Sequence, residues 1–244
     1  MSTRNANLTN VGAWCGIATT VLFVVGIVLM ASSGVQVLIP ETGKEGLEWI
    51  RDVDDAGGAF LAGGWLVVIG GLFALLALVG FYDALRSAHR LLIVAPVLSV
   101  VGFVFVTISH TLPLALAHEF VPGYIDASAA TQAALRVEFD MWAITCLVFN
   151  SIGDALLWGV VVPLYAWASL RTRAVPRWIG WLGLFTGAVA GWLGLLSPVS
   201  SVIDGITFLG FVGFFVWMAA MGVALLRRSP SHVELAPAAA PAEL

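Results

Sequence analysis

Six long apolar stretches constrain the fold of this chain more than any other feature. They cover residues 11–32, 58–82, 91–116, 145–169, 178–196 and 205–226. As an α-helix rising ~1.5 Å per residue, each is long enough to cross the ~30 Å hydrocarbon core of a bilayer. Backbone groups in lipid must find their hydrogen-bond partners within the same segment, so crossing segments of this kind are helices. We therefore predict an all-α membrane protein, a bundle of about six transmembrane helices formed by residues 1–228.

Composition supports a membrane location for the whole domain. Hydrophobic residues make up 60% of the 244 positions and charged residues only 11%, whereas ~25% charged residues is typical of a soluble domain. A soluble chain of this composition would expose large apolar patches. The net charge of -4 gives no reason to expect a nucleic-acid partner.

The basic residues predict the orientation of the bundle. With the N-terminus inside, the inner side holds eight arginines and the outer side only Lys44, Arg51 and Arg136. Because basic residues accumulate on the cytoplasmic side, we predict that both termini are cytoplasmic. Residues 229–244 are rich in proline and alanine, a composition typical of a disordered tail.

Two connections are long enough to carry structure of their own. Residues 33–57 contain an amphipathic pattern around Trp49, which predicts a short helix lying on the membrane surface. Residues 117–140 have a helical pattern from Ala129 onward, so we expect the fourth helix to begin outside the bilayer.

Three glycines in the fifth stretch recur at intervals of four: Gly183, Gly187 and Gly191. Such a row lets another backbone approach closely. We favour packing against a helix of the same chain, and a homodimer surface is the alternative.

Asp154 is the main candidate for a functional residue, because an ionisable side chain inside a membrane is costly and usually has a role. It lies fifteen residues before Ser169 at the inner boundary, ~22 Å along a helix, and therefore in the outer half of the bilayer. Asn150, Asp154 and Trp158 recur at intervals of four and share one helix face.

Other helices place polar or aromatic residues at a similar depth. Together with Asp154 and Asn150 they predict an outward-facing polar pocket with aromatic walls, lined by His110, Asp204, Asp140, Trp192 and Trp65. Two of these assignments have an alternative. Asp154 is also suited to an interhelical hydrogen bond with Asn or Ser of a neighbour, and Asp204 is suited to capping a helix N-terminus.

No motif indicates a metal site or a cofactor. Cys15 and Cys146 fall near opposite membrane faces in this topology, too far apart for a disulfide. Neither belongs to a Cys/His cluster with metal-ligand spacing. We therefore expect no metal and no cofactor.

Two functions fit these residues. The one we favour is a non-catalytic module that binds a membrane lipid, a hydrophobic small molecule or a partner protein. The alternative is a membrane-embedded enzyme acting on a lipid or isoprenoid, with Asp154 as proton donor. The sequence lacks the paired, close-spaced residues that such chemistry commonly uses, and it leaves open whether the protein is an enzyme.

Three segments carry a resemblance to a known family. They are Pro163-Leu164-Tyr165, the run VPRWIGWLGLFTGAVAG from Val175, and FLGFVGFFVWMAAMGVALLRR from Phe208 to Arg228. With them, most of residues 10–228 resembles an uncharacterised bacterial six-helix membrane family that carries a domain of unknown function. The resemblance implies a multi-pass protein of the bacterial inner membrane. It implies no activity, cofactor or catalytic residue.

Overall fold

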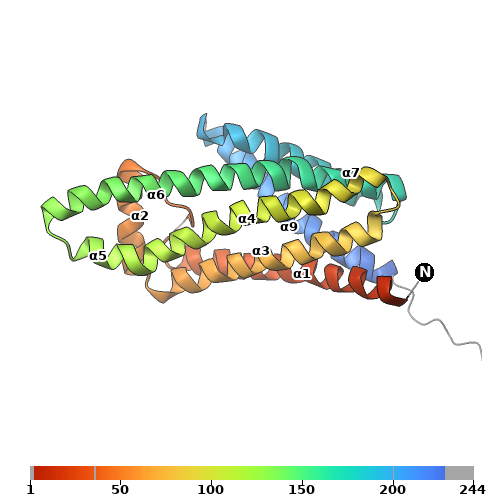
Figure 1. Ribbon diagram of the computed structural model, residues 1–244, viewed down its shortest axis with the longest axis horizontal. Helices are drawn as coiled ribbons and strands as arrows, with labels where there is room; N and C mark the ends of the chain where they lie inside the picture. Colours follow the sequence, from red (N-terminus) through yellow and green to blue (C-terminus); the bar gives the residue numbers. More distant parts are fainter. Residues whose placement is uncertain (1–2, 36, 200, 229–244) are drawn as a thin grey trace, which may run out of the picture.

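The computed structural model describes residues 3–35, 37–199 and 201–228. Within these ranges the chain is helical and contains no strand (Figure 1). The elements in chain order are α1 (Thr3–Ser32), α2 (Gly43–Ala56), α3 (Gly58–Leu85), η1 (Arg90–Ile93), α4 (Val94–Ala115), η2 (Leu116–Phe120), α5 (Val121–Ile125), α6 (Ala129–Leu156), η3 (Leu157–Val161), α7 (Val162–Thr172), α8 (Arg177–Thr186), η4 (Gly187–Trp192), η5 (Leu193–Val199) and α9 (Ser201–Arg228).

Six helical segments in the described part of the chain are long and apolar enough to cross a membrane. They are Leu8–Ser32, Gly58–Leu85, Arg90–Ile125, Ala129–Thr172, Arg177–Leu196 and Gly205–Arg228. The prediction of an all-α protein with six membrane helices is confirmed. Each predicted stretch falls within one of these segments, and the fourth segment begins at Ala129. The predicted tail, 229–244, lies outside the described residues.

The six segments form a closed ring of neighbours. α1 packs on α3 and α9, α3 packs on α4, and α4 packs on α6, while α7 and α8 complete the ring to α9. In Figure 1 α2 crosses the left end of the bundle, and the chain begins at the right end. We call these the α2 end and the termini end.

Glycines bring α1 and α3 into close contact. A Cβ added to Gly12 would lie 2.5 Å from the Cα of Gly80, and one added to Gly63 would lie 2.7 Å from the carbonyl oxygen of Gly26. Such gaps are too small for any side chain, so the two backbones touch along their lengths.

The three glycines of the fifth helix face neighbours within the same chain. A Cβ on Gly183 would lie 2.6 Å from Nε1 of Trp217, and one on Gly187 would overlap the ring of Pro163. A Cβ on Gly191 would overlap the backbone of Gly159. These contacts agree with the interpretation we favoured, and they occupy the surface that was the candidate for a homodimer.

The amphipathic helix of residues 33–57 exists as α2, and its predicted position on the membrane surface stays a prediction. The apolar face of α2 packs into the end of the bundle, where Trp49 is only 3% exposed. Its indole N–H donates to the carbonyl of Val37 at 3.1 Å. Its ring lies 5.7 Å from the Phe60 ring and 5.9 Å from the Phe139 ring. The ends of α3 and α6 therefore bury the apolar face of α2.

Three π-helical turns, η2, η3 and η4, interrupt the long helices. Pro122 follows η2 and Pro163 follows η3. Proline has no N–H, so the carbonyls of His118 and Gly159, four residues earlier, lose their α-helical partner. A π-turn pairs a carbonyl with the N–H five residues on and so bypasses the proline. η3 packs against η4, which brings Gly159 to Gly191.

Candidate functional site

A cavity of about 1520 Å³ extends from the interior of the ring of helices to its surface, where exposed residues also line it. Residues of α1, α3, α4, α6, α8 and α9 line it, and its walls are mostly apolar. Two hydrophobic cores border this space. Phe103 and Leu157 belong to the core that continues to the termini end, and Met30 and Leu38 belong to the core beneath α2.

A hydrogen-bonded network centred on Asp154 lies on the cavity wall. Its Oδ2 accepts from the side-chain amide of Asn150, and its Oδ1 accepts from the indole N–H of Trp158, each at 2.7 Å. Both bonds span four residues of one helix, so the structure places the three side chains on one face. The Ser109 hydroxyl of α4 lies 3.3 Å from Oδ1 of Asn150 and donates to it or, at 2.8 Å, to the carbonyl of Val106. The link between helices is thus made by Asn150 and not by Asp154 itself.

Aromatic contacts hold Trp158 in position. Its ring lies 3.9 Å from the Phe214 ring and 5.6 Å from the Phe211 ring, both nearly perpendicular. Such edge-to-face pairs are favourable beyond the area that they bury. They join η3 to α9 and orient the indole N–H toward Asp154.

His110 of α4 lines the same cavity. Its imidazole has no hydrogen-bond partner within the described residues. The structure therefore brings Asp154, Asn150 and His110 to one apolar space and leaves one of these polar groups unpaired.

The cavity opens sideways between α1 and α9. The predicted outward opening stays a prediction, because Val37 and Ile39 of the connection before α2 also line the cavity. The two helices touch where the Thr20 hydroxyl donates to the carbonyl of Phe215 at 3.0 Å and the Phe23 ring lies 4.9 Å from the Phe215 ring. Toward the α2 end they separate, and exposed side chains of both helices line the cavity there: Val24, Ile27 and Val28 of α1, and Phe208 and Val212 of α9. Exposed side chains of the two helices thus reach the cavity from the surface of the bundle.

The other predicted site residues lie elsewhere. Asp140 accepts the backbone N–H of Gly43 at 3.1 Å, at the first residue of α2. Trp192 and Trp65 are 60% and 51% exposed and do not line the cavity. Trp65 instead borders a second cavity of about 570 Å³. Asp204 is part of α9, but its side chain lies outside what the structure describes. The aromatic wall consists of Trp158, Phe211 and Phe214 instead.

The sequence model of one protein family matches residues 16–227. Its description is a domain of unknown function, DUF4386. The chain belongs to this family. The resemblance to a six-helix family of unknown function is therefore confirmed. No curated protein and no solved structure matches the chain. The DUF4386 match extends from α1 to Arg227 of α9 and contains every described residue of the cavity except Arg228.

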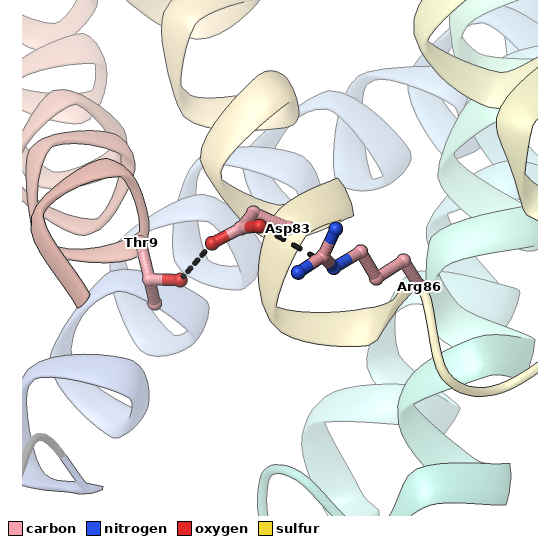
Figure 2. Close-up of polar contacts among 3 residues, drawn as sticks. All are labelled: Thr9, Asp83 and Arg86. Carbon is pink, nitrogen blue, oxygen red and sulfur yellow. Dashed lines mark hydrogen bonds and ion pairs between the residues drawn. The ribbon is translucent and has the colours of Figure 1, made fainter. Parts of the chain in front are cut away.

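The structure contains a second polar cluster, which the sequence analysis did not identify. At the termini end, the Thr9 hydroxyl of α1 donates to Oδ2 of Asp83 on α3 at 3.1 Å. Nε of Arg86 lies 3.5 Å from Oδ1 of the same carboxylate. Figure 2 shows Asp83 between these two partners. The i, i+3 spacing of Asp83 and Arg86 was the available signal. This cluster joins α1 to α3 and does not line the cavity.

No group of three or more His, Cys, Asp or Glu side chains is placed to hold a metal ion in the part of this DUF4386 domain that the structure describes. Asp154, Asn150 and His110 supply hydrogen-bonding groups to the cavity, and Asp154 and His110 can also exchange protons.

Proposed function

We propose that this protein of the cell membrane binds a membrane lipid in the cavity between α1 and α9. The observation that carries the proposal is the Asp154 network on the wall of an apolar cavity that opens sideways. Following the distribution of basic residues, the termini end would face the cytoplasm.

The size and lining of the cavity support a lipid as the ligand. Pockets for small molecules measure ~300–1000 Å³, whereas this cavity measures about 1520 Å³. Apolar walls favour acyl or isoprenoid chains. The unpaired imidazole of His110, beside Asn150 and Asp154, suits a ligand with a hydrogen-bonding group among its chains.

A second candidate function is supported by one further observation. His110 and Asp154 come from different helices and line the same cavity, so an imidazole and a carboxyl are both available to one ligand. These are the groups that general acid–base catalysis uses most often. In this alternative, the protein would be an enzyme that acts on a lipid or isoprenoid, with Asp154 as proton donor.

The binding proposal predicts that filling the cavity displaces lipid. Leu147 lines the cavity, and Val148, the next residue on α6, is similarly exposed but does not line it. We expect Leu147→Trp to displace at least two methylene groups of a bound chain. At ~0.8 kcal/mol each, this corresponds to about a tenfold loss of affinity.

Mass spectrometry of lipids extracted from the purified protein measures this effect per mole of protein. The parent and Val148→Trp should retain lipid through a fixed detergent wash, and Leu147→Trp should lose most of it. Equal lipid content in all three proteins would refute the proposal.

A further inference from the structure

The cavity has a cationic end that the Asp154 network does not explain. Arg227 and Arg228, the last residues of α9, are exposed and line the cavity. A strip of small and apolar residues of the same helix leads to them and also lines the cavity: Val216, Ala219, Ala220, Val223 and Ala224. A guanidinium binds phosphate oxygens through two parallel hydrogen bonds, which a lysine cannot do.

These two arginines have no acidic partner within the described residues. The one acidic side chain described at the termini end is Asp83, which is held by Thr9 and Arg86 (Figure 2). Within the described residues their positive charge is therefore available to an anionic ligand. Basic pockets between transmembrane helices are typical sites for anionic lipid headgroups.

The distance along α9 from the depth of Trp158 to the arginines fits one lipid leaflet. Phe214 packs on Trp158 beside Asp154, and Arg228 lies fourteen residues further along α9. This separation is ~21 Å along the helix axis. A leaflet with its headgroup region measures ~20–22 Å. A phosphate at the arginines thus places the end of its acyl chain at about the depth of Trp158.

We infer that the ligand is an anionic glycerophospholipid, with its phosphate on Arg227 and Arg228 and its chains along α9 toward Trp158. This inference rests on the proposed function and adds the chemical class of the lipid. A zwitterionic lipid carries its own cation beside the phosphate, so it gains less from two guanidinium groups.

The test is a competition between two lipids with identical acyl chains. The full chain in detergent is mixed with equal amounts of phosphatidylglycerol and phosphatidylcholine, and native mass spectrometry gives the ratio of the bound lipids. The parent should prefer phosphatidylglycerol several-fold. R227Q/R228Q should bring the ratio close to one while total bound lipid stays near the parent value.

Two controls separate charge at this site from charge in general. R90Q/R173Q removes the same charge from exposed arginines that do not line the cavity and should keep the preference. R227K/R228K keeps the charge without the bidentate geometry, so it should retain part of the preference for phosphatidylglycerol. The inference is overturned if R227Q/R228Q keeps the preference, or if R90Q/R173Q loses it equally.

The outcome for lipid content separates this inference from the proposed function. If Leu147→Trp lowers binding of both lipids but the parent does not discriminate between them, the cavity binds lipid and the headgroup assignment is wrong. If Leu147→Trp leaves binding of both lipids unchanged, the proposed function itself fails.

Discussion

Replacing Gly191 with leucine is expected to lower the free energy of unfolding by about 1–3 kcal/mol or more. A Cβ at this position would overlap the backbone nitrogen and Cα of Gly159 and lie 2.6 Å from the carbonyl carbon of Trp158. The obstacle is backbone, which cannot rotate away as a side chain does. The substitution therefore pushes η4 from η3, and with them the wall that carries Trp158.

Thermal unfolding in detergent measures this effect. Gly205→Leu is the matched control, because nothing lies within 4 Å of a Cβ added there and the residue is exposed on α9. We expect Gly205→Leu to unfold at the parent temperature and Gly191→Leu to unfold well below it. Equal unfolding temperatures for the two variants would show that η3 and η4 do not touch in the folded protein.

Replacing Asp154 with leucine is expected to cost about 0.6–2 kcal/mol, the range for polar contacts inside membranes. Leucine leaves the amide of Asn150 and the indole N–H of Trp158 without an acceptor, since both donate to this carboxyl at 2.7 Å. Asp154→Asn should remain close to the parent. If the side-chain amide of Asn150 turns over, its oxygen accepts from the new amide, and the indole keeps its acceptor.

Unfolding temperature and bound lipid should be measured for both Asp154 variants. We expect a lower unfolding temperature for Asp154→Leu only. If Asp154→Asn retains stability and lipid but a chemical conversion of that lipid stops, the enzyme alternative is correct. Parent-like stability of Asp154→Leu would contradict the network described here.

The features predictable from the sequence are those that depend on a single helix and on whether lipid or water surrounds it. Apolar length alone predicted the six helices, because lipid leaves the backbone no other hydrogen-bonded form. A spacing of four predicted the shared face of Asn150, Asp154 and Trp158, and hydrogen bonds now join them. Both arguments concern neighbours along a single segment.

The features that were missed depend on how helices rotate and meet. Trp192 and Trp65 were assigned to the pocket by depth, but depth does not specify the direction in which a residue faces, and both face outward. The sequence pattern shows that α2 has an apolar face. It does not show whether that face packs on a membrane surface or on the end of the bundle. The glycines of the fifth stretch signalled close packing without showing that a cavity opens beside them.

The most direct test of lipid binding is an experimental structure of the full chain in a lipid nanodisc. We predict elongated density in the cavity between α1 and α9, passing the side chains of Trp158 and Asp154. The account is contradicted if α1 packs on α9 along its whole length and the space beside Asp154 is filled by protein side chains.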